Sequence, residues 1–298
     1  MHRNIIAIPL TTRHWTAHEF AALHILEHLM IDGRGDMRDY YFDTVGSLWL
    51  ECMATLRKNA VLFESEVLPG HTRDIKKFVH EMVTLEPNWE YFEYEKQRVI
   101  TEVDDRSEFL KATISLYQAN FSNQYMHWPG GDLPLIKKVT VADVKNCWQI
   151  IQILPKYDMS SLREKYVLDM PKTPKVVSKN PYTFSAVGDK LVMQLSSEYF
   201  FDAPRLWQFE QYIRTAWNND FEIVIEHLPA ISVCTLSIPL YTPADAQEIV
   251  QIVYIQFLSI ATQPPTQPAT RFADHFLRAD RRQGLLEKFD KQVFESGI

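Results

Sequence analysis

The stretch Leu23-His24-Ile25-Leu26-Glu27-His28-Leu29 decides the fold, because it places two histidines four residues apart inside an apolar helical pattern. Imidazoles one helical turn apart project from the same face, so His24 and His28 can both reach one small cation, and Glu27 lies on the same side. The pattern therefore predicts half of a zinc site. The alternative interpretation is that both histidines are ordinary core or surface groups of an amphipathic helix.

A complete zinc site needs more than this stretch supplies. Zinc takes a third protein ligand and keeps an open fourth position for water, whose proton the carboxylate inside the motif can accept. The third ligand must be a Glu, Asp or His on another element. Glu102, Asp104 and Asp105 are the candidates on a later helical stretch.

Composition and charge exclude several classes of protein. The chain has 298 residues with 46% hydrophobic and 23% charged residues, which is typical of one large or two ordinary globular domains. The formal net charge of -7 and the absence of a Lys/Arg block argue against nucleic acid and anionic membrane as partners. Three widely spaced cysteines predict neither a disulfide framework nor a cysteine zinc site, and they favour the cytoplasm. No apolar run is long enough for a transmembrane helix.

Periodicity along the chain predicts an α+β fold of two similar halves, each a mostly antiparallel sheet packed with helices on one face. Residues 1–170 form the predicted zinc-binding half, 171–181 a linker containing proline and lysine, and 182–298 a shortened second half that holds substrate or binds a partner. Ser and Thr capping patterns start the helices, as at Thr16 with Glu19 and at Thr140 with Asp143. In order, the predicted elements are a strand at 5–10, helix 16–30, strands 47–56 and 59–67, helix 72–85, a helix over 89–122 interrupted near Phe109, a helix at 140–148, strand 150–154, helix 160–166, strand 190–195, helix 204–217, strands 221–226 and 232–238, and helices 243–260 and 271–296.

The first half resembles a known family, the pitrilysin/insulinase zinc peptidases, which include the mitochondrial processing peptidase. Their H-x-x-E-H helix is the inverse of the common H-E-x-x-H order and is followed, far downstream, by a glutamate ligand with another glutamate two helical turns ahead of it. Here Glu102 lies 74 positions after His28, and Glu95 lies 7 positions before Glu102. Both spacings match closely. The stretches 27–33 and 135–144 also resemble family segments, so the likeness covers about residues 4 to 165.

The resemblance implies a role for each matching residue. It makes His24, His28 and Glu102 the ligands of Zn²⁺ and Glu27 the general base. It makes Glu95 a further active-site carboxylate that orients a histidine or helps to position the site, with a solvated helix face as the alternative.

Other positions depart from the family pattern. Its N-A-x-T strand corresponds to Cys52-Met53-Ala54-Thr55, where the threonine alone is retained, and this strand, with Ala54 and Thr55, is expected to bind substrate. In the second half, the family's arginine and tyrosine correspond to Arg214 and Phe221, which are assigned to substrate binding. A phenyl ring cannot donate the hydrogen bond that a tyrosine hydroxyl provides.

The resemblance implies a zinc-dependent endopeptidase that cleaves peptides or small precursor proteins. Substrate would bind extended against the sheet edge near residues 52–56. Family members close two homologous units around a chamber, so the chain is expected to act as a homodimer or, preferably, with a separate zinc-less homologous subunit. A processing peptidase that trims a leader from a small peptide is the concrete hypothesis. The rival hypothesis is a non-catalytic structural or binding subunit of the same fold, which the four retained site residues disfavour.

Overall fold

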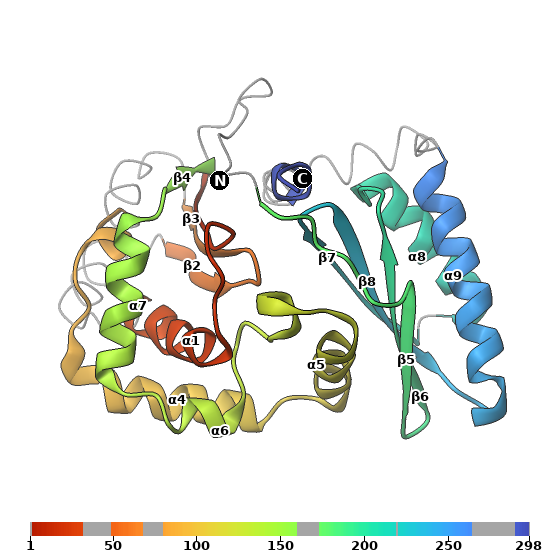
Figure 1. Ribbon diagram of the computed structural model, residues 1–298, viewed down its shortest axis with the longest axis horizontal. Coiled ribbons are helices and arrows are strands. Elements are labelled where there is room, and N and C mark those ends of the chain that lie inside the picture. The colour runs from red at the N-terminus through yellow and green to blue at the C-terminus, as the bar shows by residue number, and fades with distance from the viewer. Residues whose placement is uncertain are drawn as a thin grey trace. The chain divides into compact units, whose positions relative to one another are not determined.

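The computed structural model describes residues 2–31, 49–67, 80–159, 173–218, 220–263 and 290–297. The chain divides into two compact units (Figure 1). Unit 1 comprises Met1–Arg106 and Asn123–Leu168, and unit 2 comprises Ser107–Ser122 and Asp169–Ile298. Each unit contains a four-stranded sheet whose paired strands are all antiparallel, so the predicted α+β fold is confirmed.

The sheet of unit 1 has the strand order β2-β3-β1-β4, which makes β2 an edge strand among the described residues. Its strands are β1 (His2–Pro9), β2 (Trp49–Leu56), β3 (Ala60–Val67) and β4 (Tyr157–Asp158). Its helices are α1 (Ala17–Ile31), α4 (Phe92–Asp104), α6 (Leu133–Ile136) and α7 (Val141–Ile153), with 3₁₀ turns η2 (Trp89–Tyr91) and η3 (Asn123–Met126). The sequence did not predict the two-residue strand β4.

Helix α1 lies in the interior of unit 1, where it contacts α4, α6, α7 and β2. Most of its apolar side chains are fully buried, including Phe20, Leu23 and Leu26. A helix that is apolar nearly all round packs on several sides at once. His24 is therefore carried into the core on the same helix, with a 5% exposed fraction.

The first turn of α1 is held by the predicted capping box. The Thr16 backbone N–H donates to the Glu19 carboxylate at 2.8 Å, and the Glu19 backbone N–H donates to the Thr16 hydroxyl at 3.2 Å. Arg13 also pairs with the Glu19 carboxylate, and these contacts lower the pKa of Glu19 against the opposing effect of burial. The cap fixes where α1 begins, and so which residues face the core.

We expect Thr16→Ala to lower the free energy of unfolding by about 1 kcal/mol, because it leaves N–H groups of the first turn without an acceptor. Urea denaturation followed by circular dichroism measures the change. Ser115→Ala, which removes a hydroxyl that bonds within its own exposed helix turn, is the control and should have little effect. A Thr16→Ala midpoint equal to that of the wild type would show that the cap does not stabilise α1.

The predicted helix over 89–122 is two helices, α4 and α5 (Glu108–Asn120), separated at residues 105–107. Ser107 caps α5 by accepting a hydrogen bond from the Leu110 backbone N–H at 3.2 Å. The interruption was predicted near Phe109, but its consequence was not, since α5 belongs to unit 2. The predicted domain of residues 1–170 thus includes a helix that packs in the other unit.

Helix α7 begins with the predicted capping box of Thr140 and Asp143. The strand predicted at 150–154 is wrong, because residues up to Ile153 form the last turns of α7. The apolar run there continues a helical spacing of buried residues that includes Val144, Cys147 and Ile151. A short apolar run does not by itself distinguish a strand from a buried helix end.

Unit 2 has the strand order β5-β6-β8-β7. Its elements are β5 (Tyr182–Val187), β6 (Lys190–Ser197), α8 (Ala203–Trp217), β7 (Glu222–Leu228), β8 (Ile231–Pro239), the 3₁₀ turn η5 (Pro243–Asp245) and α9 (Ala246–Thr262). Leu191, Met193 and Leu195 of β6 pack in one core with residues of α8 and α9. Val192, which points to the opposite face of the sheet, packs against Ala112 and Leu116 of α5. Strand β5 was missed by the sequence prediction.

Residues 173–181, the described part of the predicted linker 171–181, are hydrogen-bonded into unit 2. The Thr173 and Val176 backbone N–H groups donate to carbonyls of Ser296 and Pro229, and Lys179 donates to the carbonyl of Asn120, each at 2.9 Å. A proline-containing segment can therefore be an ordered part of a domain when its backbone groups find partners.

Three predicted helices fall largely outside the described residues. The one at 160–166 lies wholly outside them, whereas those at 72–85 and 271–296 are seen only at their helical ends, 80–84 and 290–295. Within the part of the chain that the structure describes, no helix is long and apolar enough to span a bilayer.

Candidate metal centre

Helices α1 and α4 bring His24, His28 and Glu102 together in unit 1. Nε2 of His24 lies 3.4 Å from one Glu102 oxygen, and Nε2 of His28 lies 3.3 Å from the other. Within the described residues, these three are the group of His, Cys, Asp and Glu side chains able to hold a metal ion, with ligand atoms all within 4.8 Å of one another. The helical spacing of the histidines explains their common direction, and the α1–α4 packing supplies the carboxylate.

The outer ring nitrogen of His24 has a backbone partner. His24 Nδ1 lies 3.0 Å from the carbonyl oxygen of Gly130, in the loop that precedes α6. Because a carbonyl can only accept, Nδ1 must carry the proton, and in a neutral ring Nε2 then keeps its lone pair. The loop therefore fixes the ring tautomer that presents Nε2 to the cluster.

The outer ring nitrogen of His28 faces a buried carboxylate. His28 Nδ1 lies 3.4 Å from Oε2 of Glu95, whose side chain is 1% exposed. This separation is longer than a normal hydrogen bond, so the contact is electrostatic. Arg98 donates to the same Glu95 oxygen at 2.8 Å. Glu95 thus lies behind His28, within reach of both a ring nitrogen and a guanidinium.

Glu27 lies between the two histidines on α1 and is half-buried. Burial raises the pKa of Glu27, while the positive charges of His24 and His28 and a hydrogen bond from the Leu56 backbone N–H oppose the rise. Leu56 is the last residue of edge strand β2. A carboxylate with a raised pKa beside a metal-ligand cluster is suited to take up and release a proton.

The charged groups of the cluster lower the pKa of Glu102 and raise the pKa of His28. When His24 and His28 are protonated, their Nε2–H groups and positive charges next to the carboxylate hold the pKa of Glu102 far below its usual range, against the opposing effect of burial. Burial opposes the charging of His28, but the Glu102 and Glu27 carboxylates outweigh it and raise the pKa of His28. The electrostatics of the cluster therefore favour one positive charge among its side chains.

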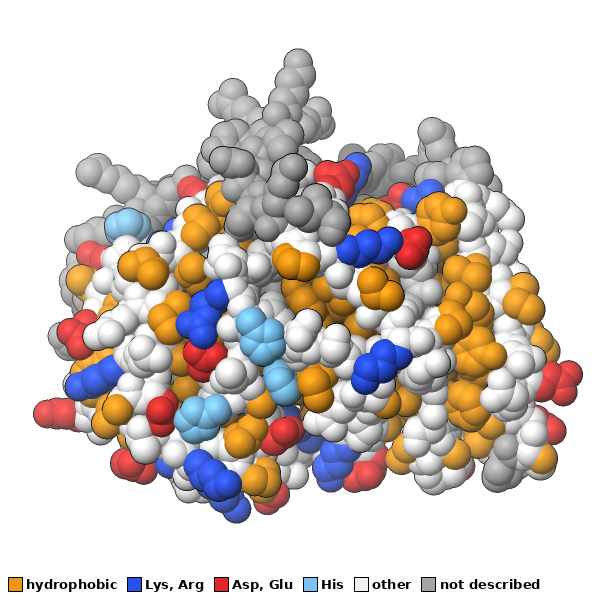
Figure 2. All heavy atoms as spheres, in the orientation of Figure 1, with side chains coloured by type: hydrophobic (Ala, Val, Ile, Leu, Met, Phe, Trp, Pro, Cys, Tyr) orange, Lys and Arg blue, Asp and Glu red, His pale blue; other side chains and the backbone are white. Residues whose placement is uncertain are grey.

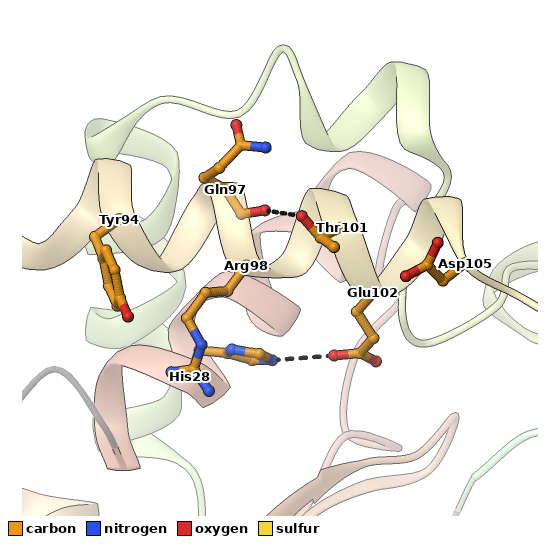
Figure 3. A pocket seen from close by; sticks show the side chains of 7 residues that line it. All are labelled: His28, Tyr94, Gln97, Arg98, Thr101, Glu102 and Asp105. Atoms are coloured by element: carbon orange, nitrogen blue, oxygen red, sulfur yellow. Dashed lines mark hydrogen bonds and ion pairs between the residues drawn. The ribbon is translucent and has the colours of Figure 1, made fainter.

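The cluster opens to solvent on the α4 side. Glu102 has a 58% exposed side chain, whereas those of His24 and His28 are 6% and 15% exposed. An open pocket of about 450 Å³ reaches the cluster, lined by His28, Tyr94, Gln97, Arg98, Thr101, Glu102 and Asp105. In Figure 3 the side chains of Arg98 and Glu102 leave α4 on the side where His28 lies. Figure 2 shows histidines at the surface of unit 1 beside basic and acidic side chains.

The remaining predicted site residues lie on two other elements. Ala54 and Thr55 are in β2, paired with Phe63 and Leu62 of β3, so they belong to an edge strand. Arg214 and Phe221 contact each other in unit 2, with the guanidinium 5.5 Å from the ring centroid. They form a cation–π pair, which is the contact that a phenyl ring can make in place of a hydroxyl hydrogen bond.

The other acidic candidates on α4 and the remaining histidine of α1 are not members of the cluster. His18 of α1 contacts Asp143 at 3.3 Å, at the start of α7. Asp104 and Asp105 are exposed at the end of α4, and neither belongs to the metal-ligand group. Of the three acidic candidates on this helix, Glu102 is thus the one that meets the histidines.

Two residues next to the cluster, Gly130 and Arg106, were not predicted as site residues from the sequence. Gly130 contributes a backbone carbonyl, which any residue could supply, so the residue type at this position does not predict the contact. Arg106 donates to the Gly131 carbonyl at 2.6 Å, beside the bond to His24. The Pro129-Gly130-Gly131 run marks a tight loop, and that run is the one available hint.

The fold belongs to the class of α+β folds with two antiparallel sheets. The chain matches no protein-family model, and no curated protein sequence matches it. Solved structures do match. A crystal structure of a conserved protein from Enterococcus faecalis superposes with a TM-score of 0.61 at 9% identity, covering 99% of this chain and 85% of that one.

Two further matches are peptidase-related by name. A peptidase M16 inactive domain from Pseudomonas fluorescens has a TM-score of 0.62 at 12% identity, covering 99% of this chain and 84% of that one. A protease from Helicobacter pylori has a TM-score of 0.54 at 13% identity, and the match covers 98% of this chain and 86% of that one. At such identities the likeness concerns the fold alone. This chain has that peptidase-like fold, which agrees with the resemblance carried by its motifs.

Proposed function

We propose that this protein is a zinc-dependent endopeptidase that cleaves peptides or small precursor proteins. The observation that carries the proposal is the convergence of His24 Nε2, His28 Nε2 and the Glu102 carboxylate. Tetrahedral ligands about 2.1 Å from zinc lie about 3.4 Å apart. The separations of 3.4 and 3.3 Å run from the two histidines to different oxygens of Glu102, and one ligand atom of each residue lies within 4.8 Å of the other two. Two imidazoles and one carboxylate are also a donor set of catalytic zinc sites.

Each side chain of the site then has a defined task. His24, His28 and Glu102 would hold the ion, and bound zinc supplies Lewis acidity that activates water and polarises a peptide carbonyl. Glu27 accepts the proton of the attacking water and returns it to the leaving amine. Glu95 faces the outer nitrogen of His28 at 3.4 Å, where its negative charge favours a proton on that nitrogen.

The edge strand β2 supports binding of an extended peptide. Its outer edge has no strand partner among the described residues, so a peptide could add as a further strand there, as main-chain recognition requires. Ala54 and Thr55 lie on this strand, and the Leu56 backbone N–H contacts Glu27 at its end. A peptide paired with β2 would thus run towards the catalytic carboxylate.

We further propose that the protein acts as a dimer, with a separate zinc-less homologous subunit preferred over a second copy, and that it acts in the cytoplasm. Unit 1 carries the whole metal cluster, while the Arg214–Phe221 pair of unit 2 is the proposed contribution to substrate binding. Native mass spectrometry of the protein purified from its source, with sequencing of any bound subunit, measures the assembly. A monomer that is fully active alone would contradict this part of the proposal.

A non-catalytic subunit of the same fold is the second candidate. It is favoured by one finding, that one of the matching structures is described as an inactive domain. The intact set of His24, Glu27, His28 and Glu102 weighs against it. Metal content separates the two functions, because an inactive subunit needs no zinc.

We expect the purified protein to contain about one zinc ion per chain and to cleave unstructured peptides, since one three-ligand site is available. Dialysis against a chelator should abolish cleavage, and stoichiometric zinc should restore it. Elemental analysis and mass spectrometry of peptide products measure both. Protein that is folded and metal-free, and that gains no activity with zinc, would favour the non-catalytic subunit.

A further inference from the structure

The loop of residues 127–132 connects two parts of unit 1 that bear on the metal cluster. On one side, the Gly130 carbonyl accepts the hydrogen bond from His24 Nδ1. On the other, the Gly131 carbonyl accepts from Nη1 of Arg106 at 2.6 Å. Adjacent carbonyls of one loop are thus hydrogen-bonded to a proposed metal ligand and to an arginine.

The loop lies directly against α1. Gly131 has a φ of +68°, and a Cβ added there would lie 2.9 Å from Cα of Ala21. Ala21 is one turn before His24 on the same helix. No side chain fits between the loop and α1 at that point, so the loop backbone can come close enough for Gly130 to reach the imidazole.

Arg106 contacts the same loop at Gly130 and Gly131. Its guanidinium is half-buried and donates to Gly131. Burial lowers the pKa of Arg106, and the nearby Asp132 and Glu102 carboxylates oppose the fall. A Cβ added at Gly130 would lie 2.4 Å from Nη2 of Arg106. The guanidinium therefore packs closely against the Gly130–Gly131 backbone.

We infer that Arg106 is a positioning residue for His24: by fixing the Gly130–Gly131 loop, it keeps the Gly130 carbonyl on Nδ1 and so keeps the lone pair of Nε2 available to a metal ion. This inference rests on the proposed metal site. Its physical basis is that partners of a ligating histidine set the ring's tautomer and orientation. In this role Arg106 acts through the loop and touches neither the substrate nor the imidazole ring of His24.

The experiment uses two substitutions that disturb the contact in different ways. Arg106→Gln removes the guanidinium. Gly130→Ala keeps it but displaces it, because the new methyl group collides with the movable end of the side chain. Arg13→Gln is the matched control, since Arg13 also supports α1 but does so through Glu19 in the first turn of the helix.

The readout is the tautomer of His24 in metal-free full-length protein, measured by ring ¹⁵N spectra at a pH well above the usual imidazole pKa of about 6.5. We expect the Nδ1–H form in the wild type and in Arg13→Gln, and a mixture with the Nε2–H form in Arg106→Gln and Gly130→Ala. Zinc affinity should fall at least about tenfold in both variants, as for other partners of ligating histidines. The double variant should lose no more zinc affinity than the more strongly affected single variant, because both substitutions act on one contact.

An unchanged tautomer and zinc affinity in folded Arg106→Gln and Gly130→Ala would overturn the inference, whatever the change in thermal stability. If Arg106→Gln does not fold, the Gly130→Ala result decides, because that variant keeps the arginine. The tautomer is read without metal or peptide, so the result is independent of catalysis. A wild type that binds zinc but cleaves nothing would contradict the proposed function and leave this inference standing.

Discussion

Glu27→Gln should reduce kcat/KM for peptide cleavage by about 10²- to 10⁴-fold, the range that a positioned general base contributes. The amide has nearly the same shape as the carboxylate and can still contact the Leu56 backbone, but it cannot take a proton from water. Zinc content should stay at the wild-type level, since Glu27 is not among the three clustered ligands. Steady-state cleavage of a fluorogenic peptide, with metal analysis of the same sample, measures both quantities.

Glu93→Gln is the matched control for Glu27→Gln. It makes the same chemical change at an exposed glutamate in the first turn of α4, away from the cluster, and should leave activity unchanged. A Glu27→Gln variant that retains zinc and cleaves at the wild-type rate would rule out Glu27 as the base. Loss of zinc together with activity would instead assign Glu27 to metal binding.

Glu102→Gln should weaken zinc binding by more than the roughly 10- to 100-fold that loss of an outer partner of a ligand costs. It removes the negatively charged member of the cluster, leaving two histidines and a weakly ligating amide. Activity measured at limiting zinc should fall in parallel. Competition with a chromophoric zinc chelator gives the affinity.

Asp104→Asn provides the control for Glu102→Gln on the same helix. Asp104 is exposed two residues further along α4 and does not join the metal-ligand group, so its amide variant should bind zinc as the wild type does. Equal zinc affinity in Glu102→Gln and the wild type would mean that the carboxylate near the histidines is a solvated neighbour. The ion, if any, would then be held by another group.

The parts of the fold that the sequence predicted are those encoded locally. Both capping boxes could be read from residues three apart, and the helical period carried His24 and His28 to one face. Glu102 is different, because nothing local distinguishes it from Asp104 or Asp105. Its selection came from long-range spacing in the family resemblance, and its position near the histidines depends on how α4 packs on α1.

Other features depended on tertiary contacts that no local pattern encodes. The apolar run at 150–154 fits a strand as well as a helix end. In the structure, residues up to Ile153 form the end of α7, whose buried side chains include Ile151. The amphipathic pattern of α5 does not say which sheet it will cover, and the helix packs in unit 2. The Gly130 carbonyl is invisible in the sequence because every residue has one, although it is the partner of His24.

The most direct test of the account is an anomalous-scattering difference map from zinc-loaded crystals, recorded on both sides of the zinc absorption edge. We predict one strong peak in unit 1, about 2.0 to 2.2 Å from Nε2 of His24, Nε2 of His28 and an oxygen of Glu102. A map with no peak among these three side chains, from crystals in which they are well ordered, would contradict it.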